Sequence, residues 1–124
     1  HYVVIDFETT ILPGLATNPD NHIVLACWYV VNGDSITKKW LFGDEYSMST
    51  LLADIEAADF LVAHNAAFEC AWLARCGADL RSLLVWCTQV GEWVLLGNNP
   101  RRLGLDLDSV SSRRLRRSKD KLGS

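Results

Sequence analysis

The sequence predicts an α/β domain in which a mixed β-sheet is flanked by helices. Short runs of β-branched and aromatic residues alternate with longer runs whose apolar residues fall at helical spacing. The first strands follow one another directly, whereas the later ones are separated by helices, and that order is typical of a mixed sheet covered by helices. With 124 residues, 49% of them hydrophobic, the chain is large enough for one domain with a real core.

The first part of the chain predicts three antiparallel strands. Residues 2–6 (YVVID), 22–31 (HIVLACWYVV) and 36–42 (ITKKWLF) are rich in β-branched and aromatic side chains. The segment 11–21 contains Pro, Gly and Asn and is expected to be a loop. Residues 32–35 (NGDS) predict a hairpin, since Asn-Gly suits the positive φ angles of a type I′ turn.

Helices and strands alternate in the middle of the chain. A helix is expected at 47–59, because apolar residues recur there on one helical face and Ser49 can cap its start. Residues 60–65 (FLVAHN) are a short apolar run without alternation, which predicts a strand buried on both faces. The next helix is expected at 66–77, with Gly77 as its C-terminal cap.

The last part of the chain continues this alternation. We expect a strand at 83–87, a helix at 88–97, a loop at 98–102 and a helix at 105–115. Asp108 or Ser109 is the expected cap of the last helix. We divide the chain into a domain at 1–112 and a basic tail at 113–124.

The net charge of −3 hides an asymmetry between the two ends of the chain. Residues 1–100 carry a net charge of −8, and residues 101–124 carry a net charge of +5. A basic segment on an acidic body favours a phosphate-rich partner, and the plainer alternative is a solvated terminus.

Composition also bears on compartment and core. No apolar stretch reaches the roughly 18 residues that span a membrane, and no secretion signal opens the chain. We therefore expect a cytoplasmic protein without a membrane partner. The four cysteines form no Cys-x-x-Cys pair, which argues against a zinc site. Four tryptophans are expected to be core residues rather than stacking platforms: Trp28, Trp40, Trp72 and Trp86.

Two carboxylates stand one residue apart where the first strand ends. Residues i and i+2 of a strand point the same way, so Asp6 and Glu8 are expected to lie side by side. Like charges so placed repel unless a cation lies between them, and Mg²⁺ or Mn²⁺ prefers such oxygen ligands. The alternative is that both are ordinary polar residues at a strand end.

A third carboxylate follows a later strand. Asn65 is a good N-cap residue, and Phe68 and Trp72 share one face of the helix that it opens. Glu69 falls near the positive N-terminal end of that helix. A capped amphipathic helix alone explains Asn65 and Phe68, but it does not explain why this element follows a strand that ends in Asp-x-Glu.

The two stretches together resemble a known family. DFET at 6–9 and HNAAFE at 64–69 resemble the first two motifs of the DEDD (DnaQ-like) 3′–5′ exonucleases, most closely the proofreading domain of family A DNA polymerases. Asp6 and Glu8 match the first motif, whereas Glu69 stands where the second motif has Asp. The resemblance implies a ribonuclease H-like mixed sheet flanked by helices.

The resemblance also implies an activity. The family hydrolyses nucleic acid from the 3′ end with two Mg²⁺ or Mn²⁺ ions. Asp6 would bridge both ions, Glu8 would hold the first and orient the water, and Glu69 would reach the second. The same resemblance implies four substrate-binding residues: Thr9, Leu12, Asn65 and Phe68. The implied partners are the 3′ end of single-stranded DNA and a DNA polymerase domain, in a bacterial or phage-infected cell.

The third motif of the family, Tyr or His followed by Asp on a late helix, has no match after Glu69. We therefore expect a fold that is incomplete at its C-terminal end, with exposed apolar sheet surface that favours a homodimer. Asp106 and Asp108 are explained better by helix capping than by metal binding. His64 is a candidate base, but its place before Asn65 favours a structural role.

Whether the chain is an active enzyme is left open by the missing motif. The alternative is a catalytically inactive remnant that binds nucleic acid or a protein partner. Nucleic acid would then be held by the arginines of the tail: Arg113, Arg114, Arg116 and Arg117. A third alternative is an interaction module with neither property.

Overall fold

The computed structural model describes residues 1–43, 48–97 and 104–116. Within these ranges the strands are β1 (Tyr2–Thr9), β2 (Ile23–Asn32), β3 (Ser35–Phe42), β4 (Phe60–Ala63) and β5 (Val85–Cys87). The helices are α1 (Ser49–Ala57), α2 (Ala66–Arg75), α3 (Thr88–Leu95) and α4 (Leu107–Leu115), with 3₁₀ turns η1 (Leu15–Thr17) and η2 (Leu80–Ser82). None of the described helices is long and apolar enough to cross a membrane.

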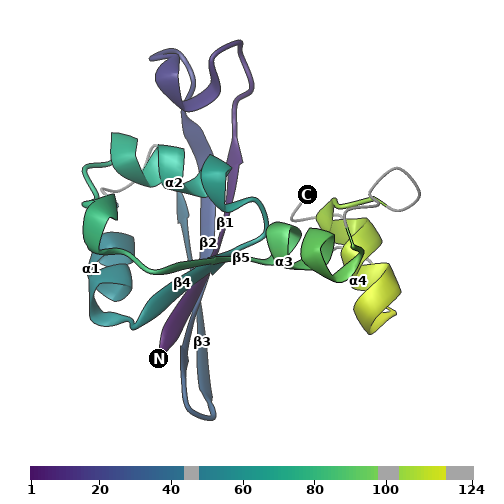
Figure 1. The fold of residues 1–124 in the computed structure, drawn as a ribbon. Helices are drawn as coiled ribbons and strands as arrows, with labels where there is room; N and C mark the ends of the chain where they lie inside the picture. Colours follow the sequence, from purple (N-terminus) through teal and green to yellow (C-terminus); the bar gives the residue numbers. More distant parts are fainter. Residues whose placement is uncertain (44–47, 98–103, 117–124) are drawn as a thin grey trace.

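The described strands form one mixed sheet in the order β3-β2-β1-β4-β5. β1 pairs antiparallel with β2 and parallel with β4. The outer pairs are β2 with β3, antiparallel, and β4 with β5, parallel. Figure 1 shows α1 and α2 on one side of the sheet and α3 and α4 on the other. The predicted α/β architecture with a mixed sheet flanked by helices is confirmed.

The alternation of side chains along β1 separates the core from the opposite face of the sheet. Val3, Ile5 and Phe7 are each less than 5% exposed, whereas Asp6 between them is exposed. The other buried apolar residues come from β2, β4, α1 and α2: Ile23, Ala26, Trp28, Leu51, Ile55, Leu61, Ala63, Ala66, Trp72 and Leu73. The main core therefore lies between the sheet and the α1–α2 layer.

The tryptophans divide between this core and the surface. Trp28 and Trp72 are 1% and 2% exposed, as predicted for core residues. Trp40 and Trp86 are each 59% exposed, so the same prediction is wrong for them. Both lie on edge strands, β3 and β5, and whether an apolar side chain is buried there depends on what covers that face of the sheet.

β4 is buried on one face, not on both as the sequence predicts. Leu61 and Ala63 are at most 1% exposed, because they face the α1–α2 layer. Phe60 is 37% exposed and Val62 is half-buried, because that layer does not cover their side of the sheet.

Gly33 lies in the predicted hairpin between β2 and β3, and Gly77 ends α2 as predicted, but the hairpin turn is not of the expected type. β2 and β3 pair up to Asn32 and Ser35, so the central residues of the hairpin are Gly33 and Asp34. Gly33 has φ +61°, whereas Asp34 is not at positive φ, which excludes the expected type I′ turn. Gly77, at φ +96°, lets the chain close a Schellman motif after α2.

Two helix caps differ from the prediction. The cap position of α1 is Met48, and the expected cap, Ser49, is the first helical residue. The cap of α4 is Asp106, not Asp108 or Ser109. Asp106 accepts hydrogen bonds from the backbone N of Ser109 at 3.1 Å and from its Oγ at 2.6 Å. Both predictions misplace the cap by one to three residues, because sequence alone does not fix where helical dihedral angles begin.

The expected loop at 98–102 and most of the basic tail lie outside the described residues. The described start of that tail is helical, since α4 continues through Arg113 and Arg114 to Leu115. The division drawn at residue 112 thus falls within a helix.

A candidate acidic site between β1 and α2

Asp6 and Glu8 both lie on the face of β1 that α1 and α2 leave uncovered. They alternate with the buried core residues of the strand, and their ladder neighbours on β2 are Cys27 and Leu25. The pairing becomes irregular between Glu8 and Thr9, where β1 approaches its end. One strand thus places two carboxylates on one face, as the period of two predicts.

The two carboxylates line an open hollow of about 490 Å³. Most of its other lining is apolar and comes from β2 and β3. Leu107 and Ser111, from α4, also line it. The acidic pair is therefore reachable from solvent across the uncovered face of the sheet.

The carboxyl group of Glu69, on α2, is buried next to β1. Its side chain is 5% exposed, and the backbone of Phe7 hydrogen-bonds to it. Among the described residues, the Oε2 atom of Glu69 has no hydrogen-bond partner. A buried polar atom without a partner costs folding free energy, and it often marks a site for an ion or a water.

The pKa of Glu69 shows that the three carboxylates interact. Burial is the main cause that raises this pKa, to about 8, and the charge of Asp6 is the next. Hydrogen bonds from the backbone of Glu69 itself and of Phe7 lower it, and the charge of Glu8 adds a smaller increase. The charges of Asp6 and Glu8 thus act on the carboxyl of Glu69, which comes from a different element of the fold.

This set of donors fits a hard divalent cation. Carboxylate oxygens are the ligands that Mg²⁺ and Mn²⁺ prefer, and a cation would offset the mutual repulsion and give Oε2 of Glu69 a partner. Across the described ranges, no three His, Cys, Asp or Glu side chains are already gathered as a metal-binding group.

Thr9 and Leu12, the residues expected near a 3′-terminal nucleotide, follow the carboxylates along the chain. The hydroxyl of Thr9 is buried and has no partner among the described residues. Leu12 is 48% exposed, and its backbone N and O both bond to the side chain of Asn21 at 2.8 Å. Asn21 is fully buried and also donates to the backbone of Leu15 at 3.0 Å. Asn21 is a residue that the sequence did not single out, because nothing distinguishes it there from other loop asparagines.

Asn65 and Phe68 lie at the start of α2. Asn65 occupies the N-cap position, as predicted, but its side chain makes no capping hydrogen bond and is exposed. Phe68 is half-buried and packs against the core. The first turn of α2 thus leaves an amide side chain exposed one turn before Glu69.

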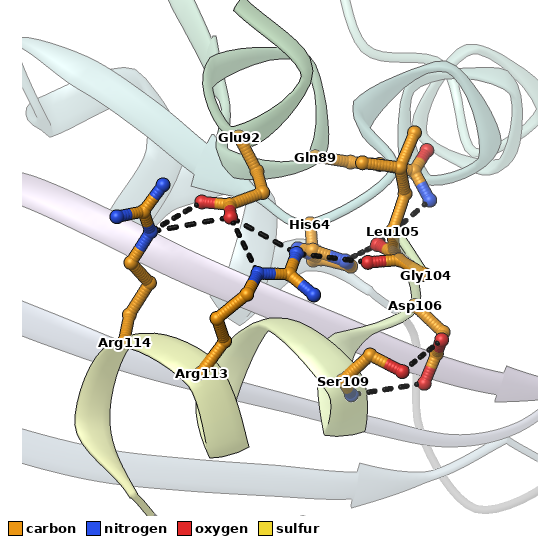
Figure 2. A network of polar contacts seen from close by, with 9 residues as sticks. All are labelled: His64, Gln89, Glu92, Gly104, Leu105, Asp106, Ser109, Arg113 and Arg114. Atoms are coloured by element: carbon orange, nitrogen blue, oxygen red, sulfur yellow. Dashed lines mark hydrogen bonds and ion pairs between the residues drawn. The ribbon is translucent and has the colours of Figure 1, made fainter. Parts of the chain in front are cut away.

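His64 holds three segments together. Figure 2 shows its ring between α3 and the segment that leads into α4. Its Nε2 donates to the carbonyl of Leu105 at 2.6 Å, and its Nδ1 lies 2.9 Å from Oγ1 of Thr88. Gln89 donates to the same carbonyl at 3.3 Å. The structural role expected for His64 agrees with these contacts, because both ring nitrogens are engaged.

Glu92 on α3 forms a second network with α4, also drawn in Figure 2. Its side chain is 3% exposed, and it accepts hydrogen bonds from Nε of Arg114 at 2.9 and 3.2 Å and from Nε of Arg113 at 3.0 Å. Nη2 of Arg113 also lies 2.9 Å from Glu92 as an ion pair. The hydrogen bond from Arg114 is the main cause that holds the pKa of Glu92 below its usual range. Arg113 also donates to the carbonyl of Gly104 at 2.9 Å. These two arginines therefore attach α4 to α3, which the basic-tail interpretation did not foresee.

Comparison with known proteins adds no family assignment. No family model matches the sequence, and no curated protein matches it.

Proposed function

We propose that this chain is a 3′–5′ exonuclease-type domain of ribonuclease H-like fold that hydrolyses single-stranded DNA. The observation that carries the proposal is the buried carboxyl of Glu69, whose Oε2 has no partner among the described residues and which interacts with Asp6. A capped amphipathic helix does not require a buried carboxyl without a hydrogen-bond partner, whereas a metal site requires carboxylate ligands.

Asp6, Glu8 and Glu69 would hold Mg²⁺ or Mn²⁺, and the family resemblance suggests two ions. Bound there, the ions would offset negative charge on a phosphodiester and lower the pKa of water. Asp6 and Glu8 would bind from the open face of the sheet, and Glu69 from the buried side. The family resemblance suggests Thr9, next in the chain, as a substrate-binding residue, although its hydroxyl is buried in this structure.

A specific observation favours a second candidate, a catalytically inactive domain that binds nucleic acid or a protein. The residues weighed as substitutes for the third motif have structural contacts, as the sequence favoured: His64 bonds to Thr88 and Leu105, and Asp106 caps α4. Arg113 and Arg114 pair with Glu92, so phosphate binding by them, as first expected, would require that network to open. An attached polymerase domain or a second copy of the chain are partners that would supply the missing groups.

The deciding experiment follows the length of a 5′-labelled single-stranded DNA in Mn²⁺. We expect shortening from the 3′ end that is lost in Asp6→Asn and retained in Asp34→Asn, a matched control at the exposed hairpin turn. Shortening that survives Asp6→Asn would place the activity elsewhere or in a contaminant. A folded wild-type chain that binds the DNA without shortening it would favour the inactive alternative.

A further inference from the structure

The hollow in front of Asp6 and Glu8 extends over the uncovered face of the sheet as far as β3. The strand register sets three rows of neighbours across β1, β2 and β3 on this face: Glu8–Leu25–Phe42, Asp6–Cys27–Trp40 and Val4–Tyr29–Lys38. All nine of these residues line the hollow. The acidic pair is thus continuous with a surface that is mostly apolar and aromatic.

Three aromatic side chains on this surface remain open to solvent. Tyr29 is 38% exposed, Trp40 is 59% exposed and Phe42 is 50% exposed. Lys38 Nζ lies 5.8 Å from the ring centroid of Tyr29, so a cation stands beside the rings. Aromatic side chains on an open sheet, next to a basic side chain, are the arrangement with which proteins stack the bases of single-stranded nucleic acid.

We propose that this aromatic surface of β2 and β3 binds the single strand that leads to the acidic site. Trp40 and Phe42 stack with bases, and Lys38 contacts a backbone phosphate. The inference rests on the proposed function in one respect, which is that the 3′ end lies at Asp6 and Glu8. The surface itself is outside the residues that the family resemblance implies.

The spacing along β3 suits a nucleobase. Trp40 and Phe42 are two residues apart on the same face, which separates them by about 7 Å along the strand. At this spacing, each of the two side chains can take a separate base of a single strand. The side chains of Leu107 and Ser111 stand on the α4 side of the hollow and would border the strand.

Charge favours nucleic acid over a protein partner on this surface. The hollow contains Asp6, Glu8 and Lys38 among its apolar residues. Charged residues are depleted from the buried centres of protein interfaces, where each would lose its hydration. A nucleic acid strand instead uses each group, since a cation binds phosphate and carboxylates bind the metal ions that contact phosphate.

The test measures anisotropy of 5′-labelled oligothymidylate and oligouridylate in EDTA at low salt. We expect Trp40→Ala to weaken binding about tenfold and Trp40→Phe to restore most of it, because a phenyl ring still stacks. Lys38→Gln should weaken binding and reduce its salt dependence. Trp86→Ala is the matched control, since Trp86 is equally exposed (59%) but does not line this hollow, and it should bind as wild type does.

Equal affinity of wild type and Trp40→Ala, or an equal loss in Trp40→Ala and Trp86→Ala, would overturn the proposal. So would self-association that Trp40→Ala abolishes in a chain that binds neither oligomer, because the surface would then be a protein interface. Comparison of the two oligomers separates DNA from RNA as the ligand. EDTA removes the metal ions, so binding is measured apart from cleavage, which is assayed separately in Mn²⁺. Trp40-dependent binding in EDTA together with no shortening in Mn²⁺ would support the surface and count against the exonuclease. Asp6-dependent shortening in Mn²⁺ that Trp40→Ala leaves unchanged would do the reverse.

Discussion

Burial raises the pKa of Glu69 on α2, and the charge of Asp6 on β1 raises it further, to about 8. The interaction links two different elements of the fold. The relationship has consequences for stability, for metal binding and for the acidic site as a whole.

Stability without divalent metal should fall as the pH rises. The folded pKa of Glu69, about 8, lies above the ordinary value of 4.5, so the folded state holds one more proton between these values. That contribution is fully present below about pH 4.5 and is lost as the pH passes 8. The free energy of unfolding should drop by up to about 1.4 kcal/mol per pH unit in this window.

Urea unfolding in EDTA across this pH range measures the slope. Glu69→Gln should flatten it, because the amide carries no charge at any of these pH values. Glu56→Gln, an exposed substitution on α1, serves as the control and should keep it. An unchanged slope in Glu69→Gln would show that the Glu69 carboxyl is not protonated in the folded chain.

Mn²⁺ should stabilise the chain, and more so at higher pH. Metal binding requires the deprotonated carboxylate, so binding at Glu69 should release a proton and strengthen as the pH approaches 8. An excess of metal of about 100 times the Kd corresponds to about 2.7 kcal/mol of stabilisation. Thermal unfolding with and without Mn²⁺ measures it, and the shift should vanish in Asp6→Asn but not in Asp34→Asn. A shift of the same size in Asp6→Asn would place the metal at another site.

Removal of Glu92 should loosen α4. Glu92→Gln leaves Arg113 and Arg114 without the charge that holds them, so the backbone amides of α4 should exchange about tenfold faster or more with deuterium. Hydrogen-exchange mass spectrometry measures the amide exchange rates of α4 separately from those of β1. Arg114→Gln added to Glu92→Gln should change the exchange of α4 little further, since both substitutions remove the same ion pair, Arg114–Glu92. Unchanged exchange in α4 would mean that the segment is held by other contacts.

Asn21→Ala should destabilise the loop that follows the acidic site. The substitution removes the buried Asn21 amide and leaves the backbone of Leu12 without two partly buried hydrogen bonds, which should cost about 1–3 kcal/mol. Limited proteolysis should then cut within residues 11–21 faster than in Asp20→Ala, a control in the same loop with an exposed side chain. Equal rates in the two variants would contradict a special role for Asn21.

The sequence by itself determined the features that depend on local rules. The period of two along β1 places Asp6 and Glu8 on one face, because successive strand residues point to opposite sides. Gly77 ends α2 because positive φ is accessible to glycine without strain. The order of strands and helices was likewise readable from hydrophobic spacing, and it predicts the mixed sheet that the structure shows.

Only the tertiary structure decided the features that depend on distant parts of the chain. It left Trp40 exposed and buried Trp28, because α1 and α2 cover one face of the sheet. It gave Glu69 its raised pKa, because burial and the charge of Asp6 come from folding and not from neighbours in sequence. It also paired the arginines of α4 with Glu92, more than twenty residues earlier. Such contacts depend on which surfaces meet, and no local pattern contains that information.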